Sequence, residues 1–194
     1  MNDRTIYAVY DDETIRVYQA YGDKIANQAL EHGTFGSEFK LDRMTWIKPS
    51  FLWMMYRSSW ATKEGQTRIL AIDIKREGFN LIAQNSILTS FKKDIYGTHE
   101  NWKILLEKSD ARCQWDPDRD IYGNPQDRRT IQLGISGIMV RRYISEWITN
   151  ITDITPNVVF LRKAIEKGEF DETMLPVEKE YNLTDTVHSY KGSL

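Results

Sequence analysis

The run TIRVYQAYGDKIANQALEHGTF, Thr14–Phe35, contains the first strand and the first helix that the sequence predicts. Its opening residues are β-branched or aromatic, as in a strand with one face toward a core. After the strand, Asp23 is the predicted helix cap and Gly33 the predicted stop. Alternation divides the strand between two faces, with Ile15, Val17, Gln19 and Tyr21 on one and Arg16, Tyr18 and Ala20 on the other.

Outward from this unit, strands and helices alternate without the regular rhythm of a parallel sheet. Strands are predicted in TIYAVY (5–10), RMTWI (43–47), RILAIDI (68–74), TIQLGIS (130–136) and the tail 178–194. Helices are predicted over 49–59, 80–87, 101–108, 137–150 and 155–168, with a turn at Glu77-Gly78 and caps at Pro49 and Thr155. The polar segment 111–129 is predicted to be a long loop. We therefore expect an α+β fold class with a split, mixed or antiparallel sheet core and flanking helices.

Size and composition limit the function classes. The 194 residues predict a single domain, 1–194, with a core over about 5–185 and frayed ends. A net charge of −2 argues against a protein that coats nucleic acid with its whole surface. The one cysteine excludes a disulfide within the chain and disfavours a cysteine-based zinc site. No leader and no apolar run long enough for a membrane span is apparent, so we expect a cytoplasmic protein with no membrane partner.

Common catalytic patterns are missing from the sequence. The histidines, His32, His99 and His188, lack ligand spacing, so we expect no metal cofactor. Cys113 is predicted to be a bystander thiol in the polar loop. The acidic triplet of that loop is expected to be solvated, with magnesium-dependent phosphotransfer as the weaker alternative: Asp116, Asp118 and Asp120.

Polar residues inside strands are the remaining signal. Buried amides and hydroxyls need partners, so each is either bonded within the core or directed at a ligand. In the aromatic segment Met44–Trp60, most of the bulk is expected to be core, and the functional residues are expected at the junction of strand and helix. The polar candidates are Arg16, Gln19, Thr45, Lys48, Ser50 and Gln132.

Three runs resemble a bacterial and fungal family of unknown function, DUF4291. They are IRVYQAY, RMTWIKPSFLWMMYRSSWATK and RRTIQLGI, and the resemblance covers about residues 5–185. This resemblance supplies a family but no chemistry.

A more distant resemblance is to the ADP-ribosyltransferase superfamily. VYQAYGDKIANQALEHGTF is similar to its first strand and helix, WIKPSFLWMMY to its second motif, and PQDRRTIQLGI to its third. The resemblance implies a cleft between two central strands that binds NAD as a substrate, and a macromolecular acceptor that is protein or nucleic acid. It assigns catalytic positions to Gln132 and Arg16. It assigns NAD-binding positions to Tyr18, Gln19, Ala20, Thr45, Trp46, Lys48 and Ser50.

The chain departs from that superfamily at two positions. Gln132 occupies the place of the catalytic glutamate, and Gln19 that of a histidine. A glutamine carries no charge, and losing one preorganised electrostatic contact costs about 3 kcal/mol of transition-state stabilisation. Three interpretations stay open: a rearranged transferase with an acid from the loop such as Asp127, a slow or nucleic-acid-directed transferase, and an inactive nucleotide binder.

A nucleic-acid-binding module is the alternative from another class. Aromatic rings and cations together suit stacking and phosphate contacts. If the cations line up on one exposed stripe, this alternative gains; if Trp46, Arg16, Gln19 and Gln132 converge, the NAD site gains. The cations in question are Lys48, Arg57, Lys63, Arg68, Arg128, Arg129, Arg141 and Arg142.

Overall fold

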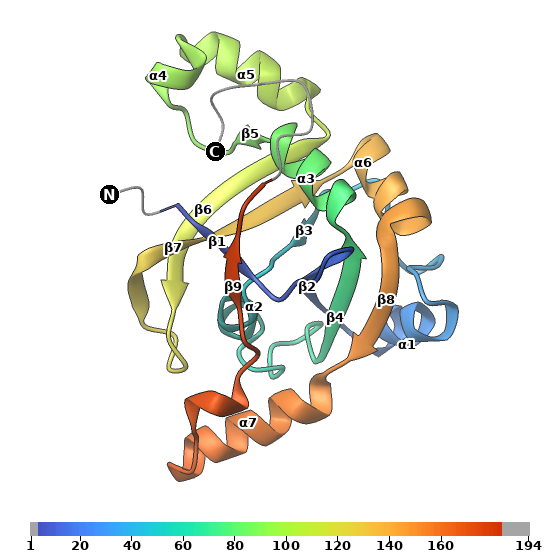
Figure 1. Ribbon diagram of the computed structural model, residues 1–194. Coiled ribbons are helices and arrows are strands. Elements are labelled where there is room, and N and C mark those ends of the chain that lie inside the picture. The colour runs from blue at the N-terminus through green and yellow to red at the C-terminus, as the bar shows by residue number, and fades with distance from the viewer. Residues whose placement is uncertain (1–3, 184–194) are drawn as a thin grey trace.

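Short sheets and the helices that flank them form an α+β structure (Figure 1). The computed structural model describes residues 4–183. The strands are β1 (Ile6–Ala8), β2 (Thr14–Tyr21), β3 (Thr45–Ile47), β4 (Arg68–Lys75), β5 (Ile87–Leu88), β6 (Ala111–Arg119), β7 (Pro125–Ile135), β8 (Ile148–Asp153) and β9 (Lys179–Tyr181). The helices are α1 (Asp23–His32), α2 (Phe51–Ser58), α3 (Arg76–Gln84), α4 (Lys93–Tyr96), α5 (His99–Lys108), α6 (Gly137–Arg142) and α7 (Thr155–Lys167). A π-helical turn (Tyr143–Trp147) follows α6, and a 3₁₀ turn (Glu172–Met174) follows α7.

The sheets divide at the strands β2 and β3. One sheet has the order β2-β4-β8, a second has the order β3-β7-β6-β5, and β1 pairs with β9. All pairs are antiparallel except β5 with β6. A single bridge joins the two larger sheets, where Tyr18 N donates to Lys48 O at 2.7 Å. The expected α+β class with mixed and antiparallel sheets is confirmed.

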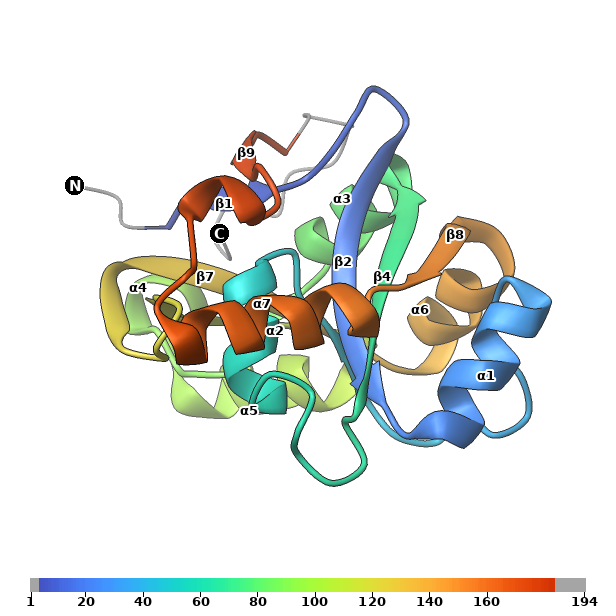
Figure 2. The same ribbon diagram turned by 90° about the horizontal axis from the view of Figure 1, so that it is seen from below.

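Apolar residues fill both faces of this arrangement. Ile15 and Val17 of β2 join the larger core cluster with Ile47 of β3. On the opposite face Tyr18 packs with α2 and α7, and Figure 2 shows α7 crossing α2 on that side of β2 and β4. The alternation predicted for β2 is therefore confirmed, because its two sets of side chains enter different clusters.

The predicted loop 111–129 is wrong, because this segment forms most of a β-hairpin. β6 and β7 pair from Ala111↔Ile135 to Arg119↔Pro125, with an irregularity between Pro117 and Arg119. Asp120 closes the turn by accepting the backbone N–H groups of Tyr122 and Asn124. Proline lacks an N–H donor and is tolerated at such irregularities, so Pro117 does not interrupt the hairpin.

The region around Gly78 also differs from the prediction. Gly78 lies inside α3 and makes no turn. A Cβ at Gly78 would overlap the buried Trp147 ring, so glycine allows the π-helical turn to approach α3. The helix predicted over 137–150 ends in that turn, and its last residues begin β8, a strand that the sequence did not predict.

Helix boundaries shift by one or two residues. Gly22, not Asp23, occupies the cap position of α1, and Ile154, not Thr155, that of α7. Ser50 caps α2, so the helix begins after the predicted Pro49 start. Gly33 and Gly168 end their helices in the left-handed conformation, as predicted.

Three consecutive non-glycine residues directly after α2 adopt the left-handed conformation. Ser59, Trp60 and Ala61 have φ values of 50°, 53° and 64°. Such residues cost about 1 kcal/mol or more each relative to helical conformations.

In residues 4–183 no helix combines the length and apolarity that crossing a bilayer requires.

Candidate functional site

One face of the second sheet gathers most of its polar side chains. Trp46 of β3 and Lys48, which directly follows β3, alternate with Ile47, which enters the core. Gln132 of β7 alternates in the same way with Ile131 and Leu133. The pairs Trp46↔Gly134 and Gln114↔Gln132 bring β3, β7 and β6 together on this face. We call this set the polar face: Trp46, Lys48, Gln114, Asp116, Thr130, Gln132 and Gly134.

Trp46 lies over Gly134. A Cβ at Gly134 would lie 3.0 Å from Cζ2 of Trp46 and 2.6 Å from Sδ of Met44. Glycine on β7 therefore lets the indole rest against the strand. Trp46 is partly exposed, and Gln132 lies two residues from Gly134 on the same face. An aromatic ring thus lies near a hydrogen-bonding amide.

Asp116 accepts hydrogen bonds from both glutamine side chains of the polar face. Gln114 Nε2 donates to Oδ1 at 2.8 Å, and Gln132 Nε2 donates to Oδ2 at 2.7 Å. Gln132 is 8% exposed, so its amide needs such a partner. A carboxylate on the neighbouring strand is therefore in direct contact with the amide at position 132.

Lys48 is the cation among the named residues of the polar face, and the charge of Asp116 acts on it. It is 7% exposed, and its Nζ donates to Trp46 O at 3.3 Å. The pKa of Lys48 is lowered to about 8, chiefly by burial and also by the charge of Arg57, while Asp116 acts in the opposite direction. A substantial fraction of Lys48 is consequently neutral at slightly alkaline pH.

A second polar network lies at the start of α2. Ser50 Oγ accepts Trp53 N and donates to Asp118 Oδ1, each at 3.3 Å. Arg128 donates to Asp118 Oδ2 through Nε at 3.0 Å and Nη2 at 2.6 Å. Ser50 is 2% exposed, so its contacts are those of a buried helix cap.

Glu178 and Tyr18 border this network. Glu178 Oε1 accepts Phe51 N at 2.6 Å, and burial raises the pKa of Glu178 to about 7, with Asp118 adding to the rise. The Tyr18 hydroxyl is buried and has no hydrogen-bond partner in residues 4–183. Burial raises its pKa, and the charge of Glu178 raises it further. Tyr18 therefore has an unused polar atom beside an acid.

Gln19 and Thr45 do not belong to the polar face. Gln19 Nε2 donates to Thr45 Oγ1 at 3.0 Å and to Trp46 O at 3.3 Å, while Tyr143 OH donates to Gln19 Oε1 at 2.9 Å. Tyr21 OH shares a hydrogen bond with Thr45 Oγ1. Both predicted binding residues thus face the core cluster, and their side chains join β2 to β3 beyond the Tyr18↔Lys48 bridge.

Arg16 and Ala20 lie on β2, on the same side of that strand as Tyr18. Arg16 forms two hydrogen bonds to Asp73 of β4, Nε to Oδ1 at 2.8 Å and Nη2 to Oδ2 at 3.0 Å. This pairing raises the pKa of Arg16. Of the four residues expected to converge, the polar face brings together only Trp46 and Gln132.

The predicted loop charges also take different positions. Asp118 is 2% exposed and Cys113 is fully buried in β6, so the predictions of a solvated acid and a loop thiol are wrong. Burial raises the pKa of Cys113 to about 12, which keeps the thiol protonated. Asp127 is exposed, and Asp116 is the acid that contacts Gln132. The period-two run Gln114, Asp116, Asp118 was the signal in the sequence.

Metal ligands and a basic stripe were the other possibilities. Among residues 4–183 no cluster of three or more His, Cys, Asp or Glu could hold a metal ion, and His188 lies outside the described residues. Three of the eight cations of the predicted stripe form ion pairs with acids: Arg68 with Asp153 and Asp23, Arg128 with Asp118, and Arg142 with Glu146. Such pairing weakens the case for one continuous stripe.

Comparison with known proteins gives a family and no activity. A family model described as "Domain of unknown function (DUF4291)" matches residues 5–181. No curated protein matches the chain.

Proposed function

The chain belongs to the DUF4291 family, and we propose that it is an ADP-ribosyltransferase-like protein that binds NAD on the polar face. One observation carries this proposal: the strands of the three resembling motifs are neighbours. β2 meets β3 at Tyr18↔Lys48, and β3 pairs with β7 at Thr45↔Ile135. Resemblance in sequence order does not require this adjacency, so the adjacency supports a shared site.

The polar face offers the groups that NAD chemistry requires. The partly exposed indole of Trp46 suits stacking on a flat nicotinamide ring. Gln132 and Gln114 offer amides for ribose hydroxyls. Asp116 offers a carboxylate for the positive charge that develops on the ribose as nicotinamide leaves. Trp46 is thus proposed as the binding ring, and Asp116 as the acid.

The proposed reaction exchanges one bond at the nicotinamide ribose. The bond between the ribose C1′ and the nicotinamide nitrogen breaks, and nicotinamide leaves with the electron pair. A lone pair of the acceptor forms the new bond to C1′, and the acceptor loses a proton. Lys48, with a pKa of about 8, is a candidate to receive that proton in its neutral form.

A non-catalytic nucleotide-binding module is the second candidate. The observation that favours it is the amide of Gln132 in place of an acid, already bonded to Asp116. In this alternative the polar face binds NAD or a related nucleotide without breaking the glycosidic bond. The acceptor in the first candidate is a protein or a nucleic acid.

A titration with NAD, followed by tryptophan fluorescence, tests binding, and release of nicotinamide tests catalysis. We expect saturable quenching that is lost in Trp46→Ala. Asp116→Asn is expected to lower nicotinamide release about a hundredfold with a smaller change in affinity. Asp127→Asn is the matched control, because this exposed acid lies on β7 away from Gln132. Binding without release selects the second candidate, and no binding at millimolar NAD contradicts both.

A further inference from the structure

A polar pocket lies beside β6, beyond the end of β5. Its volume is about 510 Å³, within the range of small-molecule sites. Two segments build much of the wall: β6 and the residues that follow β5, where Thr89 N donates to Cys113 O at 2.9 Å. The residues that line the pocket are Arg4, Leu88, Thr89, Ser90, Lys92, Cys113, Gln114, Trp115 and Arg129.

The described residues around this pocket carry charge of one sign. Among the described residues that line it, Arg4, Lys92 and Arg129 are cations and none is an acid. Arg4 and Lys92 form no ion pair within residues 4–183. Arg129 Nη1 donates to Trp115 O at 3.2 Å, which fixes its guanidinium at the wall. Cations that line one pocket add to its positive electrostatic potential, which attracts anions.

The other lining groups favour a phosphate ester over a simple anion. Thr89 and Ser90 add hydroxyl donors, and Trp115 adds an aromatic wall. Cys113 contributes no reactive thiolate, because burial raises its pKa to about 12. A neighbouring pocket of about 280 Å³ shares Arg4 and Trp115 but also includes the acid Glu180. Because an acid repels an anion, the larger pocket accommodates an anion better.

We infer that this pocket binds a nucleotide unit through its phosphate, with Arg4, Lys92 and Arg129 as the phosphate contacts and Trp115 beside the base. The unit comes from a free nucleotide or from a single-stranded nucleic acid, since both present the same phosphate and base. Gln114 lines the pocket and also bonds Asp116 of the polar face. The inference does not depend on NAD chemistry at the polar face.

Two probes distinguish the sources: ADP, and a fluorescein-labelled single-stranded oligonucleotide of mixed sequence. Affinity for each is measured by calorimetry or fluorescence anisotropy over a range of salt. Lys92→Gln and Arg4→Gln are expected to weaken binding about tenfold, because each removes a charge-assisted contact. For the oligonucleotide, each change should also reduce the slope of log affinity against log salt concentration by about one.

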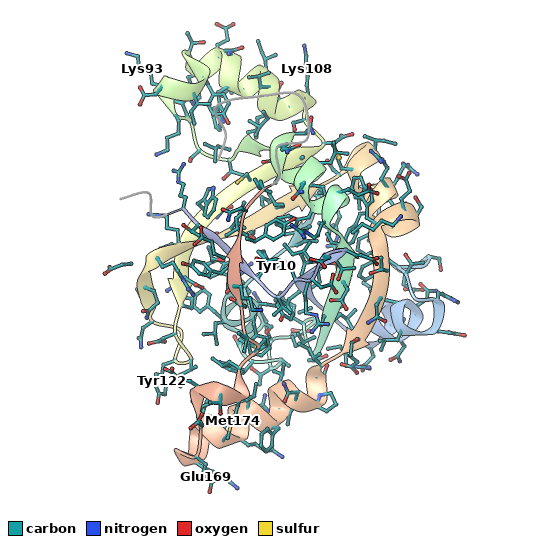
Figure 3. The ribbon with its side chains drawn as sticks, viewed as in Figure 1. Tyr10, Lys93, Lys108, Tyr122, Glu169 and Met174 are labelled. Carbon is teal, nitrogen blue, oxygen red and sulfur yellow. The ribbon has the colours of Figure 1, made fainter. Side chains whose placement is uncertain are left out.

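Lys93→Gln is the matched control. Lys93 is exposed on the outer side of the α4–α5 unit, away from the sheets, and does not line the pocket (Figure 3). Binding of ADP alone or of the oligonucleotide selects the source. The inference is overturned if neither probe binds, or if Lys92→Gln and Arg4→Gln bind as the control does. Loss of NAD binding in Trp46→Ala with unchanged ADP or oligonucleotide binding keeps the two sites distinct.

Discussion

Gln132 and Asp116 are joined across the β6–β7 ladder by a hydrogen bond of 2.7 Å from the amide nitrogen to the carboxylate. The donor and the acceptor belong to different strands, and Gln114 completes the set from the β6 side at 2.8 Å. A glutamate at position 132 could not donate this bond when ionised. The glutamine is therefore the residue type that the neighbouring acid requires.

Gln132→Glu should accordingly destabilise the protein most at neutral pH. Two carboxylates that share a site raise the pKa of one of them in the folded state. The folded protein then binds a proton that the unfolded chain releases, so stability falls as pH rises above about 4.3. We expect a loss of about 1–3 kcal/mol at pH 7 and less at pH 5 in urea unfolding. Gln126→Glu, exposed on the same strand, should show neither effect.

Glu178→Gln should remove a pH dependence that the wild type carries. Burial raises the pKa of Glu178 to about 7 from an ordinary value of 4.5. The protonated carboxyl thus contributes about 3 kcal/mol to the free energy of unfolding below pH 4.5. This contribution is lost as the pH rises to about 7. Glutamine keeps an oxygen for Phe51 N and cannot ionise, so the variant should be more stable than wild type at pH 8.

The surroundings of Glu178 define the control for this measurement. Asp118 raises and Arg128 lowers its pKa, and the buried Tyr18 hydroxyl is close enough to be influenced by it. Glu180→Gln, at an exposed position of β9, changes the same charge without burial. If wild type and Glu178→Gln lose stability in parallel between pH 5 and pH 8, Glu178 ionises without cost and the explanation is wrong.

Gly134→Ala should displace Trp46. The new methyl group would lie 2.6 Å from Met44 Sδ and 3.0 Å from Trp46 Cζ2. Overpacking of this kind costs about 1–3 kcal/mol, and Trp46 emission should shift as the ring moves. Met44→Ala removes the nearer clash, so the double variant should recover part of the loss. Strictly additive effects in the double variant would mean that Met44 does not limit the space above Gly134.

Alternation in the sequence identified β2 and β4 but not the β6–β7 hairpin. TIRVYQAY and RILAIDI were predicted with the observed positions because their apolar residues dominate. In β6, by contrast, Gln114, Asp116 and Asp118 alternate with Cys113 and Trp115, and Pro117 and the turn residues give the run the composition of a loop. The period-two run of polar residues was a signal for a strand, but a run on one strand does not identify the partners on β7 that satisfy these groups.

The candidate site was predicted in part for the same reason. Trp46, Lys48 and Gln132 do share a face, whereas Gln19 and Thr45 face the core cluster. Alternation had already assigned Gln19 to the face of Val17, opposite Tyr18. Combining both faces of β2 in one site was therefore the weak step. Asp116 was not among the predicted site residues because its contact with Gln132 depends on the ladder between β6 and β7.

Ser59→Gly should stabilise the protein. Ser59 is exposed and has a φ of 50°, a conformation in which glycine has no steric penalty. The gain is expected to be about 0.5–1 kcal/mol in thermal or urea unfolding, reduced by the greater freedom of glycine in the unfolded chain. Ser59→Val, whose branched side chain opposes positive φ, should be destabilising. Equal stability of both variants would contradict a strained left-handed segment.

Variants of Arg16 and Asp73 can distinguish a structural role of Arg16 from a catalytic one. Its paired hydrogen bonds to Asp73 at 2.8 and 3.0 Å lie on partly buried side chains of adjacent strands. Lysine cannot reproduce the two-pronged geometry, so Arg16→Lys should lower stability by about 1 kcal/mol. If this pair is the whole role of Arg16, then Asp73→Asn should cause a similar loss and the double variant should lose little more. If Arg16 also contacts NAD, Arg16→Lys should weaken NAD binding while Asp73→Asn, compared at equal folded fraction, leaves it nearly unchanged. Equal effects of the two variants on NAD binding would assign Arg16 to the sheet rather than to catalysis.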